Sequence, residues 1–213
     1  MKWMMLSVAA TATLAVSLPT TAFAQTTAAP GPSAADVRTT QELIDAADSA
    51  PLVAGPNAAA ASGKVPSLYP RNKGAILVTP DPYKGLPLGH SAIVLTDNTV
   101  VESVAEGVKL GPNNWYQSKK QVYGTIVQAT SSKQNAKAAD WAAKQRHKPY
   151  NYNYLDINTR KKFYCSQLIY AAFKDNFGIN LNTDRYKTPV GNPVHPMELA
   201  VKNPKVGLIY RQK

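Results

Sequence analysis

Apolar and polar positions divide the second half of the chain into runs typical of strands and of helices. Short β-branched runs bounded by Gly, Pro, Asn or Asp predict strands. They cover 75–79, 91–95, 99–104, 121–129 and 206–210. Longer runs predict helices at 133–146, with Ser132 as the N-cap and Pro149 beyond its end, and at 166–177, followed by Gly178. Because strands dominate the middle and helices lie apart, the predicted class is α+β.

The first 24 residues have the pattern of a secretory signal peptide. Lys2 precedes an apolar run at 4–16, and Ala22-Phe23-Ala24 forms a small-residue cleavage pattern before Gln25. The run is shorter than the roughly 20 residues that a membrane span needs. The pattern therefore predicts a secreted, periplasmic or cell-wall-associated protein after cleavage, and an uncleaved N-terminal anchor is the alternative.

Residues 25–69 are rich in Ala, Pro, Ser and Thr. A short helix is expected at 34–47 with Ser33 as its N-cap. Few large apolar residues are present elsewhere to offset the entropy of ordering. We expect a linker or loosely held arm, as a passive spacer rather than a cover for an active site, and one folded domain at 70–213.

The chain is basic, with a formal net charge of +11. Such an excess attracts anionic surfaces, for which cell-wall polymers and acidic lipids are candidates, although solubility alone explains it equally well. Scattered basic residues and the lack of a recognition motif disfavour nucleic acid as a partner.

The single cysteine, Cys165, cannot form an internal disulfide. It stands at the start of the helix predicted at 166–177. Unpaired backbone N–H groups at a helix N-terminus favour a thiolate and can stabilise an oxyanion. The position therefore makes Cys165 a candidate nucleophile, and a small, buried, inert residue is the alternative.

A nucleophilic thiol needs a base, and His90 opens a predicted strand one strand before Glu102. A carboxylate among apolar neighbours is costly unless it is paired, although a solvated strand face is the alternative. The two side chains share a face only if the hairpin register is even. A three-residue loop at 95–97 gives that register, whereas a two-residue turn at 97–98 places them on opposite faces. Glu106 has the same parity and is the reserve candidate.

The two remaining histidines show no metal-site spacing. His147 is expected to face solvent, and His195 is expected in a loop. Neither forms a spaced pair with another ligand, and no phosphate-binding glycine loop is present. We therefore expect neither a metal nor an organic cofactor.

Four short motifs together resemble the circularly permuted NlpC/P60 group of the YiiX/YebB type, a group of papain-like cysteine hydrolases. The resemblance covers roughly 74–210. It implies an antiparallel sheet or half-barrel packed against the cysteine-bearing helix. The motifs are Gly89-His90-Ser91-Ala92-Ile93-Val94, Val101-Glu102-Ser103, Lys148-Pro149-Tyr150 and Tyr164-Cys165-Ser166-Gln167-Leu168.

Carried onto these motifs, the resemblance implies Cys165 as nucleophile, His90 as general base and Glu102 as the residue that orients His90. Tyr150 is implied as a substrate or oxyanion contact, and a core or rim aromatic is its alternative. Tyr164 receives no chemical role.

The implied reaction cleaves an amide, through a thioester acyl-enzyme, in the peptides of peptidoglycan. A lipid-directed acyl hydrolase or acyltransferase is the alternative enzyme. A non-catalytic wall-binding or effector module on the same fold is the third possibility. The polar, tyrosine-rich segment before Cys165 leaves peptide or lipid substrates open.

Overall fold

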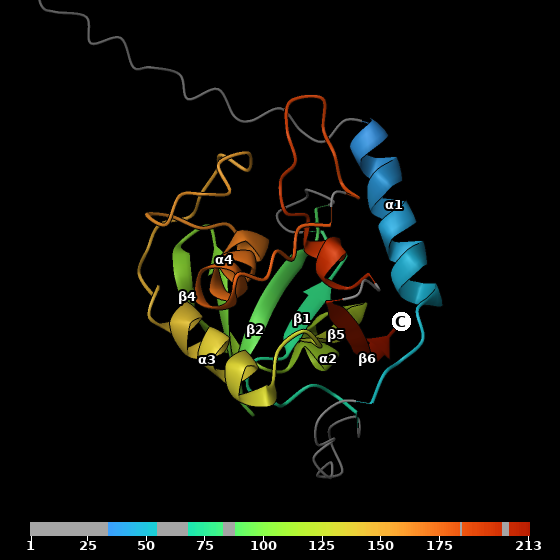
Figure 1. Cartoon of the computed structure of the whole chain (residues 1–213). Helices are drawn as coiled ribbons and strands as arrows, with labels where there is room; N and C mark the ends of the chain where they lie inside the picture. The colour runs from blue at the N-terminus through green and yellow to red at the C-terminus, as the bar shows by residue number, and fades with distance from the viewer. Residues whose placement is uncertain (1–33, 55–67, 83–87, 184, 202–204) are drawn as a thin grey trace, which may run out of the picture.

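The computed structural model describes residues 34–54, 68–82, 88–183, 185–201 and 205–213. Its centre is a six-stranded antiparallel sheet of order β4-β3-β2-β1-β5-β6 (Figure 1). The strands are β1 Ile76–Thr79, β2 His90–Thr96, β3 Thr99–Val104, β4 Gly107–Pro112, β5 Val122–Val127 and β6 Val206–Gln212. The helices are α1 Ala34–Ser49, α2 Trp115–Ser118, α3 Ser132–Ala143, α4 Cys165–Phe177 and the 3-10 helix η1 Pro196–Leu199.

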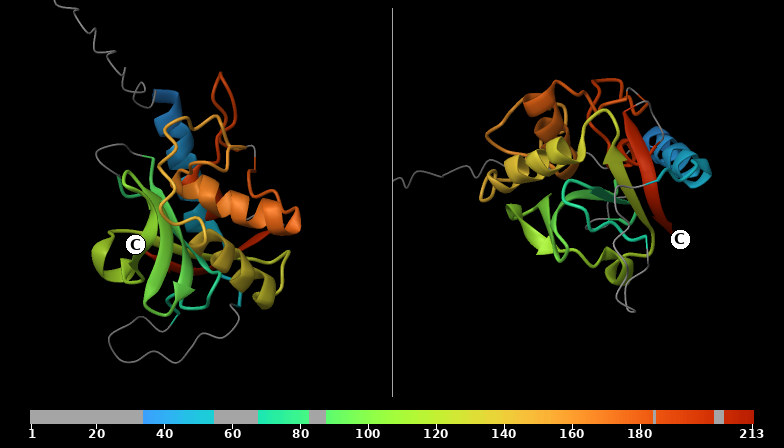
Figure 2. Two further views of the ribbon diagram at one scale, coloured as in Figure 1. Left: turned by 90° about the vertical axis from the view of Figure 1, so that its left-hand side faces the viewer. Right: turned by 60° about the horizontal axis from the view of Figure 1, so that its bottom comes forward.

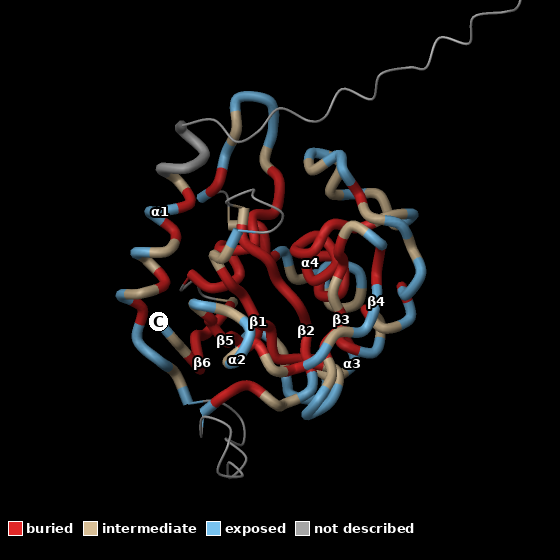
Figure 3. Tube along the Cα trace, turned by 180° about the vertical axis from the view of Figure 1, so that it is seen from behind, coloured by how far each residue is buried: buried red, intermediate tan, exposed pale blue. Residues whose placement is uncertain are grey.

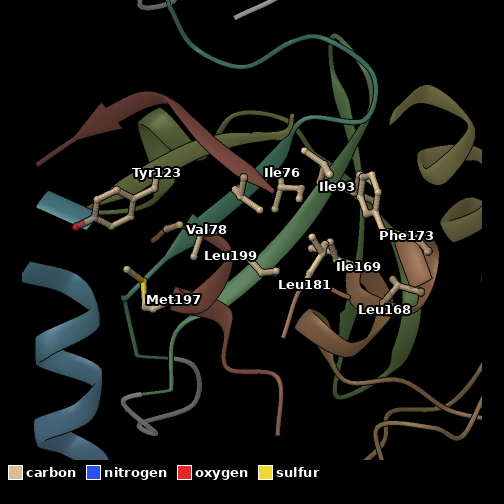
Figure 4. Close-up of a cluster of buried hydrophobic side chains, with 14 of the residues drawn as sticks. Ile76, Val78, Ile93, Tyr123, Leu168, Ile169, Phe173, Leu181, Met197 and Leu199 are labelled. Atoms are coloured by element: carbon tan, nitrogen blue, oxygen red, sulfur yellow. The ribbon is translucent and has the colours of Figure 1, made fainter. Parts of the chain in front are cut away.

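Helices cover one face of this sheet. The helices α3 and α4 pack over β2 and β3, while η1 and α1 lie toward β1 and the β6 edge (Figure 2). Ile76 and Ile93 of the sheet meet Ile169 and Phe173 of α4 in the main core (Figure 4). Most of α4 and of the central strands is buried, whereas the loops beyond them are exposed (Figure 3). The predicted α+β class is confirmed.

The hairpin of β2 and β3 differs from the expected one. Thr96 pairs with Thr99 across a two-residue turn, but Val94 pairs with Val100, so the register shifts by one between the two pairs. Such a bulge adds one residue to one strand and reverses the parity that the turn alone would set. The three-residue loop at 95–97 was wrong, yet the resulting register is even.

The caps of α3 and α4 explain where these helices begin and end. The N-cap of α3 is Ser131 rather than the predicted Ser132, and it forms a reciprocal capping box with Gln134. The helix ends at Ala143, earlier than predicted. Gly178 terminates α4 as predicted, with a φ of +69° that favours glycine.

Besides the 3-10 helix η1, two elements were not predicted. The edge strand β4 contains glycine, lysine and proline, which are depleted in strands, so its pattern resembles a loop. The short helix α2 has too few residues for a periodic pattern. Both elements flank the candidate active site.

The helix α1 is packed rather than loosely held. Leu43, Ala47 and Ala50 belong to the main core, and Val53 N–H donates to the Leu208 carbonyl at 2.7 Å. These residues recur at helical spacing, which an average over an Ala/Pro-rich segment conceals. The expected arm at 25–69 therefore contains a docked helix. Its predicted cap, Ser33, and the signal segment at 1–24 lie outside the described residues.

Candidate active site

His90 and Glu102 form a hydrogen-bonded pair on the sheet face that α4 does not cover. Their strands place Glu102 opposite Ala92, so the two side chains lie diagonally on one face. His90 Nε2 and Glu102 Oε2 are 2.7 Å apart, and only 6% and 14% of the side chains are exposed. A Cβ at Gly111 of β4 would collide with Glu102 Oε1, so glycine leaves the room that this carboxylate occupies.

Cys165 completes the cluster from the N-terminus of α4. Its thiol is buried and hydrogen-bonded to the His90 ring. Because Nε2 of His90 bonds to Glu102, Nδ1 is the ring nitrogen that remains for the sulfur. The structure thus brings together three residues that are distant in sequence.

The electrostatics of the cluster favour charged side chains. Burial by itself lowers the pKa of His90, but hydrogen bonds to Cys165 and Glu102 and their negative charges raise it to about 9. Burial likewise opposes the Cys165 thiolate, yet the hydrogen bond and charge of His90 bring the pKa of the thiol below its usual value. For Glu102, the attraction of His90 outweighs burial and lowers the pKa. The mutual attraction of the three groups therefore favours their charged forms, the thiolate, the imidazolium and the carboxylate.

Trp115 packs against the His90 ring. The two rings stack with centroids 5.4 Å apart and an interplanar angle of 25°. Trp115 N–H donates to the Tyr69 hydroxyl at 3.0 Å, and Lys119 Nζ lies 5.6 Å from the Trp115 ring centroid. Sequence analysis missed Trp115, because nothing in its local pattern marks a partner that only the tertiary fold supplies.

The residues after Cys165 hold the surrounding loops. Ser166 Oγ donates to the Val194 carbonyl at 2.6 Å. Gln167 Oε1 accepts from the N–H of Tyr164 and from Asn151 Nδ2, at 3.1 and 2.9 Å. The Cys-Ser-Gln motif therefore joins the start of α4 to loops on both sides of the thiol, which explains its residue types structurally.

Tyr150 lies in a cluster of tyrosines. Its ring centroid is 4.9 Å from that of Tyr152 and 6.4 Å from that of Tyr154. Burial and the negative charge of Cys165 raise the pKa of Tyr154, so Tyr154 is a member that approaches the thiolate. A substrate or oxyanion contact for Tyr150 stays a prediction.

The other candidates lie elsewhere. Glu106 is exposed in the β3–β4 turn, 3.8 Å from Lys109 Nζ. His147 is exposed, as expected, whereas His195 is buried at the start of η1. Across the described ranges, no group of three or more His, Cys, Asp or Glu side chains could hold a metal ion. Nor is any helix within those ranges long and apolar enough to cross a membrane.

Comparison with known proteins gives one family and one similar fold. A family model described as permuted papain-like amidase enzyme, YaeF/YiiX, C92 family, matches residues 81–190, slightly more than half of the chain. A crystal structure of the metalloprotein YiiX from Escherichia coli O157:H7 is similar with a TM-score of 0.52 and 17% identity. The similarity covers 67% of this chain and 98% of that one, and at this identity it shows the fold alone. No curated protein matches.

These findings confirm the papain-like fold and the resemblance to a permuted family that the sequence motifs indicated. The chain belongs to the C92 family of permuted papain-like amidases of the YaeF/YiiX type, and it is a cysteine hydrolase.

Proposed function

We propose that this hydrolase cleaves an amide bond in the peptides of bacterial cell wall, with Cys165 as nucleophile and His90 as general base. Glu102 holds the His90 ring in position. The observation that carries the proposal is the buried series of hydrogen bonds from Cys165, at the N-terminus of α4, through His90 to Glu102. A thiol, a base and an orienting acid in this arrangement are suited to acyl transfer.

The reaction follows from the charge states. The Cys165 thiolate attacks the amide carbonyl carbon, and the oxygen takes up the negative charge. Backbone N–H groups at the start of α4 hold that oxyanion. The His90 imidazolium donates its proton to the nitrogen as the C–N bond breaks, which leaves a thioester. His90 then removes a proton from water, which attacks the thioester and releases the acid and the thiolate.

Two sequence features support a wall substrate. The signal-like segment at 1–24 would export the protein, and the net charge of +11 attracts polyanions. No cofactor takes part in this mechanism.

A lipid-directed acyl hydrolase or acyltransferase is the second candidate, and a surface feature favours it. Tyr152, Leu155 and Val190 expose 62%, 43% and 76% of their surface. They come from the two loops that Gln167 and Ser166 hold at the start of α4, and Leu155 lies against Gly191. We call these three residues the apolar rim. Exposed cations on the same two loops are Lys161, Arg185 and Lys187. Aromatic, aliphatic and basic side chains together suit an anionic lipid surface.

The deciding experiment compares the wild-type protein with Cys165→Ala. Each is incubated with purified peptidoglycan and with vesicles of phosphatidylglycerol and phosphatidylethanolamine, and products are identified by mass spectrometry. We expect wall-peptide fragments from the wild type alone. Fatty acid or transferred acyl groups from the wild type alone would favour the lipid candidate instead. Fragments from both proteins would refute Cys165 as nucleophile.

A matched variant tests the apolar rim. The double variant Leu155→Ser, Val190→Ser leaves Cys165, His90 and Glu102 in place. If lipid is the substrate, we expect turnover on vesicles to fall at least tenfold while wall activity is unchanged.

No product from either substrate, with a folded wild type, would favour a non-catalytic wall-binding or effector module.

A further inference from the structure

Ser91 is a buried polar residue that the mechanism above does not use. It follows His90 on β2, so its side chain points to the opposite face of the sheet, beneath α4. It pairs with Val78 of β1, and Val78 and Ile93 on this face belong to the apolar core. Sequence analysis quoted Ser91 only as part of a strand motif.

The Ser91 hydroxyl has no hydrogen-bond partner among the described residues. A buried hydroxyl without a partner costs free energy, so each such group in a native structure needs an explanation. Cys165 begins the helix α4 that packs on β2, and both the hydroxyl and the backbone N–H of Ser91 lower the pKa of its thiol. Sulfur accepts hydrogen bonds weakly as a thiol but strongly as an anion.

We propose that the Ser91 hydroxyl donates a hydrogen bond to the Cys165 thiolate and thereby holds the nucleophile in place for attack. His90 and Ser91 are consecutive residues of β2, and the side chain of each donates a hydrogen bond to the sulfur. One strand therefore supplies both donors. The unpaired hydroxyl is explained by the charge state of its neighbour. When the thioester forms, the sulfur loses its negative charge and this bond weakens.

The titration of Cys165 tests the proposal directly. Because the chain has one cysteine, the rate of alkylation by iodoacetamide reports this thiol alone. We expect Ser91→Ala to raise the midpoint of the rate against pH by about one unit, which slows alkylation about tenfold on the acidic side of the midpoint. An unchanged midpoint in Ser91→Ala would overturn the proposal.

Ser103→Ala is the matched control. Ser103 is equally buried on the neighbouring strand, but its hydroxyl donates to the Phe163 carbonyl at 2.6 Å. Its removal should lower the melting temperature without moving the alkylation midpoint. A midpoint shift as large as that of Ser91→Ala would mean that loss of any buried hydroxyl disturbs the site, which would also overturn the proposal.

A second pair of variants keeps the test valid if Ser91→Ala does not fold. Ser91→Thr and Ser91→Val have nearly the same shape, but only threonine retains a hydroxyl. We expect the threonine variant to titrate like the wild type and the valine variant to titrate about one unit higher. Equal midpoints in the two variants would refute the hydrogen bond. The inference rests on the proposed nucleophile, yet alkylation needs no substrate. Normal titration without cysteine-dependent turnover would therefore count against the proposed function alone.

Discussion

The molecule contains two buried histidine–glutamate pairs, and they differ in every contact that bears on reactivity. On β2 and β3, the ring of His90 bonds to the carboxylate of Glu102 and to Cys165. At η1, the carboxylate of Glu198 accepts from the backbone N–H of His195 at 2.9 Å, while the His195 ring makes other contacts. Burial beside a carboxylate is common to both pairs and distinguishes neither.

The η1 pair has the contacts of a structural cap. His195 Nδ1 accepts from the Met197 N–H at 3.1 Å, so that nitrogen carries no proton and Nε2–H faces Thr40 Oγ1 at 3.3 Å. Among the described residues, the donors to the other oxygen of Glu198 are neutral. They are Thr183 N–H and Oγ1, Arg185 N–H and Tyr186 N–H. A histidine becomes a base for catalysis when its ring, rather than its backbone, joins the acid to a nucleophile.

Exchange of each histidine gives the largest expected difference. His90→Asn removes the base, and we expect kcat/KM to fall by about 10³-fold in a protein that still folds. His195→Asn retains a side-chain acceptor at the N-cap of η1, so activity should stay within about twofold of the wild type. Initial rates on the substrate that the peptidoglycan and vesicle experiment identifies measure the activity of both variants. Circular dichroism tests whether each variant is folded. Equal losses in the two variants would remove the distinction between the pairs.

The pH dependence should also separate the pairs. The pKa of His90 is raised from its ordinary value of 6.5 to about 9, so its contribution to stability is complete below pH 6.5 and is lost as pH rises through 9. The loss is on the order of 3 kcal/mol. Urea unfolding of the wild type between pH 6 and 10 should show it.

His195→Asn should retain the same decline with pH, and His90→Asn should lack it. Turnover should fall over the same alkaline range, because neutral His90 cannot protonate the leaving amine. If the free energy of unfolding still declines with rising pH in His90→Asn, the decline belongs to another titrating group.

The sequence predicted which residues meet at the active site better than it predicted the strand register that brings them together. Apolar alternation placed β2 and β3, and the cost of a carboxylate in an apolar strand pointed to a partner for Glu102. Parity then required an even register, which a bulge between Val94 and Thr96 supplies instead of a longer turn. Bulges depend on the packing of both strands, so a single strand's pattern does not contain them.

What the sequence did not reveal are contacts between distant elements. Trp115 stacks on His90 from a helix too short to leave a pattern. Gly111 gives room to Glu102 from a strand whose composition resembles a loop. The docking of α1 depends on Leu43, Ala47 and Ala50, within a segment whose Ala/Pro-rich composition predicted a linker. In each case the role of the residue comes from a contact with a residue distant in sequence, and local propensity does not encode such contacts.

Conversion of each glutamate to glutamine is expected to have a smaller effect. In Glu198→Gln, one oxygen becomes an NH₂ group that faces an N–H donor, and we expect unfolding free energy to fall by about 2 kcal/mol with activity retained. Glu102→Gln should instead cause a clear loss of kcat, because the ring of His90 loses its charged partner. Urea unfolding and initial rates measure the two effects. Activity loss in Glu198→Gln at full folding would give the η1 pair a role in catalysis.

The smallest expected effect sharpens the comparison at the carboxylate itself. In Gly111→Ala, the added methyl would meet Glu102 Oε1 and displace the carboxylate from His90, and we expect kcat to fall about tenfold with the fold intact. Gly178→Ala at the end of α4 is the matched control, since it meets no atom within 4 Å but has a φ of +69°. It should cost about 1 kcal/mol of stability through that backbone strain and leave kcat unchanged. Full activity in Gly111→Ala would mean that catalysis tolerates displacement of the Glu102 carboxylate. The contact between the His90 ring and Glu102 would then not distinguish this pair from the structural pair at η1.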